Sequence, residues 1–158
     1  MSYVKDEEAK KKIVDALTKF MGDSALVYIK VHGFHWNIIG PRFKTLHELF
    51  EEHYTNLWES LDGIAERIRA LGAKAPGSFV ELIEASSIEE YNTAPNADLM
   101  LRKAYDDYQK LISHAHEVEK VAEEYGDTFT VDMMTQRVGE LEKMAWMTIA
   151  HLQGGREG

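Results

Sequence analysis

Apolar side chains recur at intervals of three and four residues along four long stretches of the chain, which is the spacing of one buried helix face. In the first stretch this face carries Ile13, Leu17, Phe20, Val27 and Val31. The pattern predicts four long helices. They run from about Lys5 to Phe34, Phe43 to Leu71, Asn96 to Tyr125 and Thr130 to Leu152.

Glycine and proline mark the breaks between these stretches. Gly40-Pro41 precedes the second helix, and Gly72 follows it. Ser78-Phe79-Val80-Glu81 has the form of a capping box, so a short helix to about Ala85 is expected in the long connection that follows. Four long helices with one long crossover between the second and third predict an all-α, ferritin-like four-helix bundle, with residues 1–158 as a single domain.

Composition narrows the possible functions. The chain has no cysteine, which excludes disulfides, thiolate zinc sites and cysteine nucleophiles. Its net charge of −9 argues against a nucleic-acid groove and for a protein that attracts cations. No apolar run reaches the roughly 20 residues of a membrane span, and the first residues lack the apolar core of a signal peptide. We therefore expect a cytoplasmic protein.

Five residues of metal-ligand type stand out: His35, His47, Glu51, Asp62 and Glu66. The last four lie on the second predicted helix, where a rise of about 1.5 Å per residue puts His47 and Asp62 roughly 22 Å apart. Metal–ligand bonds are only about 2 Å long, so residues this far apart cannot bind one ion within a single chain. If they share a metal, the carboxylates come from a second copy of the chain.

Asp62 and Glu66 are like-charged and one turn apart, which mildly destabilises a helix unless a cation lies between them. Each candidate residue also has a simpler explanation that involves no metal. Taken alone, the pair reads as a solvated face with Arg67 and Arg69 nearby. Trp36 and Trp58 taken alone read as packing residues. His32 and His53 read as exposed or capping side chains at helix ends, with no assigned role.

Three motifs in a fixed order give a more specific indication than the single residues. They are His35-Trp36-Asn37, then Gly40-Pro41-x-Phe43-x-x-Leu46-His47, then Asp62-x-x-Ala65-Glu66-Arg67-Ile68-x-x-Leu71-Gly72. Together they resemble the Dps family of mini-ferritins in order and spacing. Trp146-Met147 in the last helix extends the resemblance, which covers nearly the whole chain.

The resemblance implies a function. Dps proteins are dodecameric shells that oxidise Fe(II), usually with hydrogen peroxide, and store a ferric mineral. Their di-iron ferroxidase centres are shared between two subunits. By position, His35, His47 and Glu51 would form one half of such a centre, and Asp62 and Glu66 the other. The family often has Asp where this chain has Glu51, so this ligand departs from the family pattern.

Further roles follow for a few other residues. Trp36, next to the first ligand, is expected to give up an electron and quench a stray radical. Glu48 and Glu52 could face a cavity and nucleate ferric oxide. Asp127 and Asp132 lie around the start of the fourth long helix, where the family places iron-entry pores.

Two alternative functions belong to other classes of protein. A conventional ferritin or di-iron oxygenase binds its metals inside one bundle through E-x-x-H pairs, and no glutamate of this chain has a histidine three residues later. The other alternative is a DNA-binding, nucleoid-associated Dps with weak or no ferroxidase activity. The lysine-rich tail that such proteins use is not matched here: the first twelve residues hold Lys5, Lys10, Lys11 and Lys12 against Asp6, Glu7 and Glu8, and the segment 153–158 has one Arg and one Glu. We therefore expect weak or no DNA binding.

Overall fold

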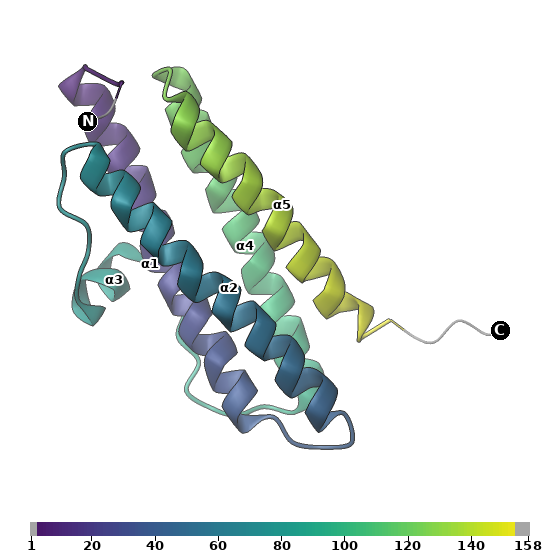
Figure 1. Cartoon of the computed structure of the whole chain (residues 1–158). Helices are drawn as coiled ribbons and strands as arrows, with labels where there is room; N and C mark the ends of the chain where they lie inside the picture. Colours follow the sequence, from purple (N-terminus) through teal and green to yellow (C-terminus); the bar gives the residue numbers. More distant parts are fainter. Residues whose placement is uncertain (1–2, 154–158) are drawn as a thin grey trace.

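The computed structural model describes residues 3–153 and is all-helical over that range (Figure 1). The part of the C-terminal segment that bears on DNA binding, residues 154–158, lies outside the described residues. The helices are α1 (Glu7–Asn37), α2 (Phe43–Ala70), α3 (Phe79–Ala85), α4 (Ala97–Glu124) and α5 (Thr128–Ala150). The expected all-α, ferritin-like bundle with a short helix in the crossover is confirmed.

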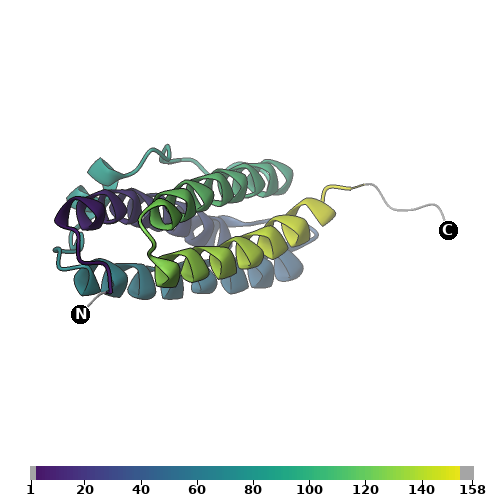
Figure 2. The ribbon, with the colours of Figure 1, turned by 90° about the horizontal axis from the view of Figure 1, so that it is seen from above.

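The helices form two antiparallel pairs, α1 with α2 and α4 with α5, and α1 also packs on α4 (Figure 1). A long crossover carries the chain from the end of α2 back along the bundle to the start of α4. Figures 1 and 2 show this crossover on the outside of the bundle, with α3 against α1. Among the described residues, no helix is long and apolar enough to cross a membrane.

The helix ends follow local rules of capping. Asp6, Ser78, Asn96 and Asp127 each accept a backbone N–H of the first turn of the helix they precede. The Ser78 hydroxyl accepts the backbone N–H of Glu81, as the capping box predicts, and it also donates to the Glu81 carboxylate. The predicted ends are shifted by a few residues: α1 continues past Phe34 to Asn37, and α5 begins at Thr128. His35 therefore lies in the last turn of α1.

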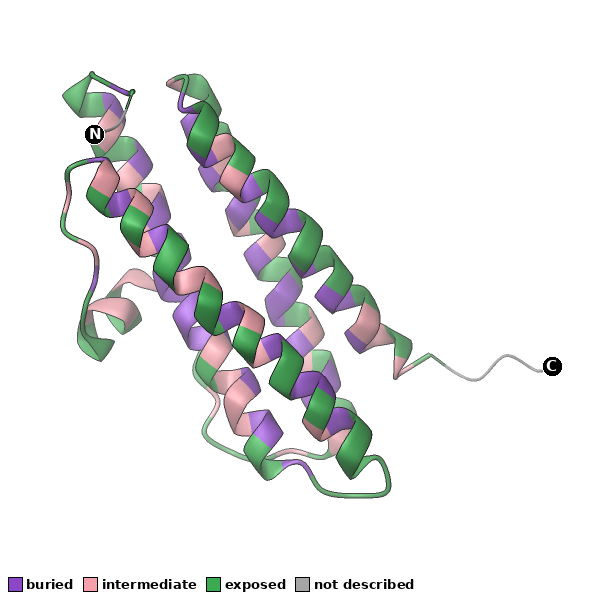
Figure 3. Ribbon diagram, in the orientation of Figure 1, coloured by how far each residue is buried: buried purple, intermediate pink, exposed green. Residues whose placement is uncertain are grey.

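The predicted apolar faces form the core (Figure 3). Side chains from α1, α2, α4 and α5 meet there, and Phe20, Phe50 and Tyr108 are among the largest that are fully buried. One segment is more enclosed than periodicity predicts, because residues 21–27 of α1 are buried on every side. The crossover and α3 cover the face of α1 that the bundle leaves free.

Candidate metal centre

His35 and His47 lie side by side where α1 ends and α2 begins. The turn between the helices uses Gly40 at φ 111°, a conformation that favours glycine, and the Phe43 N–H donates to the Gly40 carbonyl at 3.0 Å. This turn sends α2 back antiparallel along α1. Residues twelve apart in sequence are thereby brought into ring contact, with the imidazole centroids 3.7 Å apart and the planes 15° apart.

The two histidines orient each other through the backbone. His35 Nδ1 donates to the His47 carbonyl at 2.7 Å, and His47 Nδ1 donates to the His35 carbonyl at 2.7 Å. A carbonyl only accepts, so both Nδ1 atoms carry the proton and both Nε2 atoms keep a free lone pair. This is how metal-binding histidines are usually held, with one ring nitrogen hydrogen-bonded and the other available to the metal.

The acidic candidates are exposed on α2. Glu51 lies one turn beyond His47, and Asp62 and Glu66 lie further along the same unbroken helix. None of the three has a hydrogen bond or ion pair with another residue in the described part of the chain. Asp62 lines a groove of about 740 Å³ between α2 and α3, together with the exposed rings of Trp58 and Phe79.

The structure does not bring the two sets of candidates together. Within residues 3–153, no group of three or more His, Cys, Asp or Glu side chains is placed to bind a metal. Because α2 is continuous from Phe43 to Ala70, the expected separation of roughly 22 Å between His47 and Asp62 along its axis holds. One chain therefore presents a pair of histidines and, separately, a pair of carboxylates.

The remaining candidates have mixed surroundings. Glu48 and Glu52 are exposed on α2. Asp132 is also exposed, whereas Asp127 is buried, caps α5 and forms an ion pair with Arg67 at 2.6 Å. This contact gives Asp127 a structural role that the sequence did not suggest. The pore role of both aspartates stays a prediction.

Two histidines that the sequence left without a role are part of the packed structure. His32 is stacked between Trp36 and Tyr54, with ring centroids 3.9 and 3.8 Å away. His53 is buried, and its Nδ1 lies 2.9 Å from the Tyr108 hydroxyl. Reading either one as an exposed or capping residue at a helix end was wrong. His32 and Trp36 are one turn apart on α1, and this spacing was the available signal for their contact.

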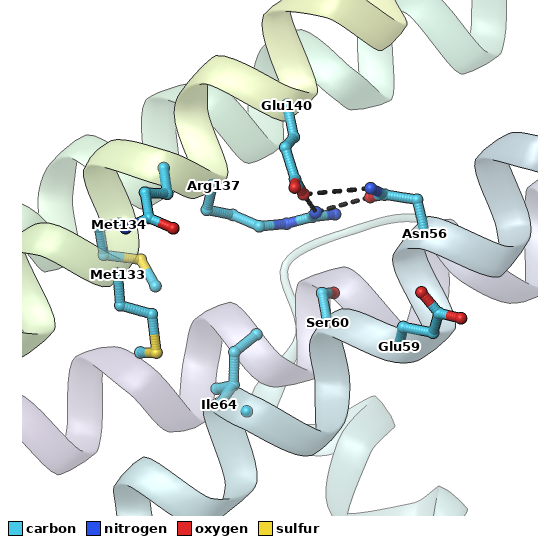
Figure 4. A pocket seen from close by; sticks show the side chains of 10 residues that line it. Asn56, Glu59, Ser60, Ile64, Met133, Met134, Arg137 and Glu140 are labelled. Carbon is cyan, nitrogen blue, oxygen red and sulfur yellow. Dashed lines mark hydrogen bonds and ion pairs between the residues drawn. The ribbon is translucent and has the colours of Figure 1, made fainter.

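A third missed residue is Arg137 of α5, whose guanidinium is buried between α5 and α2 (Figure 4). Its Nη1 donates to the Asn56 side chain at 2.6 Å and to Glu140 at 2.9 Å. Burial lowers the pKa of Arg137, and the charge of Glu140 opposes this shift. Asn56, Arg137 and Glu140 line a pocket of about 300 Å³ between the two helices. Their hydrogen bonds connect α2 to α5 at this point.

The chain matches the ferritin-like domain family over residues 14–157. A relative from Bacillus anthracis, DNA protection during starvation protein 2, is 37% identical over 90% of this chain and 97% of its own length. Antigen TpF1 from Treponema pallidum is a structural neighbour with a TM-score of 0.91 and 34% identity, covering 98% of this chain and 99% of that one.

A Dps protein from Vibrio cholerae O1 has a TM-score of 0.90 and 32% identity, with 94% of this chain and 93% of that chain covered. It is described as a member of a broad superfamily of ferritin-like diiron-carboxylate proteins. These likenesses extend over almost the whole chain in both sequence and fold. The chain therefore belongs to the ferritin-like family and, within it, to the Dps proteins.

Proposed function

We propose that two copies of this chain bind Fe(II) between them and oxidise it with hydrogen peroxide or dioxygen, acting as a ferroxidase. His35, His47 and Glu51 of one copy would face Asp62 and Glu66 of the other. Many such sites would line a dodecameric shell, in which the ferric product is stored as a mineral. The protein would act in the cytoplasm, with residues 1–158 as one domain.

The observation that carries this proposal is the orientation of the histidine pair. Both Nδ1 atoms are hydrogen-bonded to backbone carbonyls, so both Nε2 atoms are available to a metal ion. Imidazole nitrogens combined with carboxylates suit non-haem Fe(II). Two nitrogens alone hold an ion weakly, and the carboxylates of Asp62 and Glu66 from a second copy would add their charge to that of Glu51.

The exposed carboxylates support the same arrangement from the other side. Asp62 and Glu66 repel each other one turn apart, and neither has a cationic partner within the described residues. Asp62 also borders the groove with Trp58 and Phe79, whose rings are 60% and 85% exposed. A second copy that covered these rings would bring its histidine pair to the carboxylates.

In the reaction the chain's residues would position the substrates. Peroxide needs two electrons and two protons to become two molecules of water, and each Fe(II) supplies one electron. Holding two Fe(II) ions at one site therefore avoids the release of hydroxyl radical. Exposed acids such as Glu48 and Glu52 would take up Fe(III), and the exposed Asp132 is the better placed of the two pore candidates.

Mixed particles test whether the site is shared. His47→Ala and Asp62→Ala proteins should each be inactive alone when Fe(II) is loaded anaerobically and peroxide is added. If they are co-assembled in equal amounts, a site is intact when its histidines come from an Asp62→Ala chain and its carboxylates from a His47→Ala chain. Random pairing across a two-fold interface then restores about a quarter of the sites.

The matched control mixes His35→Ala with His47→Ala. Both changes fall in the same half of the site, so no combination of chains has an intact histidine pair and no activity should return. Particle mass, measured on the same samples, shows that the chains have mixed and what assembly they form. If proven mixtures of His47→Ala and Asp62→Ala stay inactive, the shared site is wrong.

A further inference from the structure

Phe43 is the first residue of α2 and lies one turn before His47. Its backbone N–H donates to the Gly40 carbonyl, so the turn that reverses the chain also fixes where this side chain begins. Residues four apart on a helix are neighbours on one face, and the Phe43 ring is stacked on the His47 imidazole, with the centroids 4.9 Å apart and the planes 22° apart. Phe43 is 44% exposed, so packing in the core does not account for this contact.

His47 is the middle ring of a stack of three. The His35 imidazole lies 3.7 Å from it, with the planes 15° apart, and the Phe43 ring lies against it as well. The described residues show no ring contact between Phe43 and His35, so these two rings lie on opposite faces of His47. Both flat faces of the His47 imidazole are therefore covered.

The two histidines differ in what else holds them. The His35 residue is buried, and its ring also contacts His32 and Tyr54. His47 is only partly buried, and among the described residues its ring contacts only His35 and Phe43. The hydrogen bond from Nδ1 to the His35 carbonyl holds one edge of the His47 ring but lets the ring tilt about that bond. Phe43 limits this tilt on the side away from His35.

We propose that Phe43 is a positioning residue of the shared iron site and holds the His47 imidazole in the plane that presents Nε2 to Fe(II). This inference rests on the proposed ferroxidase function and adds a residue to it. Phe43 has no ligand atom, so it acts only through His47. A ligand that is already oriented loses less freedom when the metal binds, and the stacked ring should therefore raise the affinity for the metal.

Two substitutions separate the flat ring from apolar bulk alone. Phe43→Leu keeps an apolar side chain without a flat face, whereas Phe43→Tyr keeps the ring. Because Phe43 is exposed in the first turn of α2, neither change opens the core. The matched control is Phe129→Leu, which removes an exposed ring from the start of α5, at the other end of the bundle from the start of α2 (Figure 1).

Binding of Co(II) to the assembled protein, without any oxidant, measures the affinity of the site directly. Co(II) takes nitrogen and carboxylate ligands as Fe(II) does, and its visible absorption reports on them. Replacing a residue that orients a metal ligand typically lowers metal affinity by about 10- to 100-fold, and we expect about tenfold for Phe43→Leu. Phe43→Tyr and Phe129→Leu should bind Co(II) like the wild-type protein.

Turnover with Fe(II) and peroxide gives a second measurement. Phe43→Leu should raise KM for Fe(II) and leave kcat near the wild-type value, because Phe43 contributes to binding and not to the oxidation itself. Partial unfolding would instead lower kcat. Circular dichroism on each variant checks that it is folded.

A double variant tests whether Phe43 acts through His47. In a His47→Ala background the stack has lost its middle ring, so adding Phe43→Leu should not weaken the remaining Co(II) binding further. An equal loss in both backgrounds would mean that Phe43 acts on something other than His47, and the proposal would be wrong. Particle mass is recorded for every variant. A loss of affinity found only in particles that have come apart would also overturn the proposal.

Co(II) affinity that is unchanged in Phe43→Leu, or lowered as much in Phe43→Tyr, would overturn this inference and leave the ferroxidase function standing. Wild-type protein that neither binds Co(II) nor oxidises Fe(II) with peroxide would overturn both.

Discussion

His53 lies in the middle of α2, with its ring packed edge-on against Tyr108 of α4. Burial, and secondly the charge of His151, lowers the pKa of His53 to about 4. Its Nε2 is buried without a hydrogen-bond partner among the described residues, so a charged imidazole would find no acceptor there. Burial also raises the pKa of Tyr108 well above its ordinary value, which keeps the hydroxyl protonated. The pair is therefore neutral in the folded protein.

This pair makes stability depend on pH. The unfolded chain binds a proton on His53 below its ordinary pKa of 6.5, whereas the folded chain resists it down to about pH 4. Stability from this residue is therefore complete above pH 6.5 and declines as the pH falls. The loss reaches about 3 kcal/mol at pH 4.

Denaturant unfolding of wild type and His53→Gln across this pH range measures the effect. The amide can still bond to Tyr108 but does not titrate, so the variant should show a flatter decline in unfolding free energy. His116→Gln removes an exposed histidine and should leave the wild-type slope unchanged. Equal slopes in wild type and His53→Gln would contradict the role given to His53.

At the scale of elements, the contact between α1 and the crossover depends on small and polar side chains. Asp23 is fully buried and accepts hydrogen bonds from the Ser86 hydroxyl, the Ser87 N–H and His114. These bonds connect α1 to the segment after α3 and to α4. Gly22 lies beside this point, and a Cβ there would be 2.7 Å from the Leu82 carbonyl oxygen. The crossover can approach α1 closely because this position has no side chain.

Gly22→Ala should therefore destabilise the protein, although alanine is the better helix former. The added methyl collides with backbone, which has to move, and overpacking of this kind costs about 1–3 kcal/mol. Gly33→Ala on the same helix meets no atom within 4 Å and should be neutral or stabilising by up to about 1 kcal/mol. Thermal unfolding of both variants measures the difference. A Gly22→Ala protein as stable as Gly33→Ala would show that the crossover is not held closely against α1.

At the scale of the whole molecule, the net negative charge favours cations as partners over DNA. The chain carries 27 acidic and 18 basic residues, and an assembly of several copies multiplies this excess. Lysines near the N-terminus are neutralised locally, since Lys10, Lys11 and Lys12 pair with Glu7, Asp15 and Glu8. One relative is named for DNA protection, so DNA binding by this chain is worth testing. Because few lysines are left unpaired near the N-terminus, we expect few contacts with DNA phosphates.

We expect no retardation of plasmid DNA by the wild-type protein in a gel shift at physiological salt and neutral pH. A variant with Glu7→Lys and Glu8→Lys adds positive charge to an exposed helix start and should retard the plasmid at low salt. Raising the salt should release it, because phosphate contacts are lost as counterions compete. Retention of plasmid by the wild-type protein at physiological salt would contradict this prediction.

The sequence by itself determined the helices and the division of the candidate site. Periodicity and capping act within a few residues, so the helix limits and the Ser78–Glu81 box could be predicted to within a few positions. The fixed rise of a helix likewise separates His47 from Asp62 in any fold that keeps α2 whole. A site shared between two copies is therefore an inference that needs only the sequence.

Only the tertiary structure decided how side chains from different helices meet. The reciprocal bonds of His35 and His47 depend on the turn at Gly40, and Arg137 of α5 bonds to Asn56 of α2, 81 positions earlier in the chain. The ring contacts of Tyr54 with His35 and with Tyr28 depend on how α1 packs on α2. Such contacts are set by helix rotation and packing distance. These depend on the whole core, and the pattern of any single segment does not contain them.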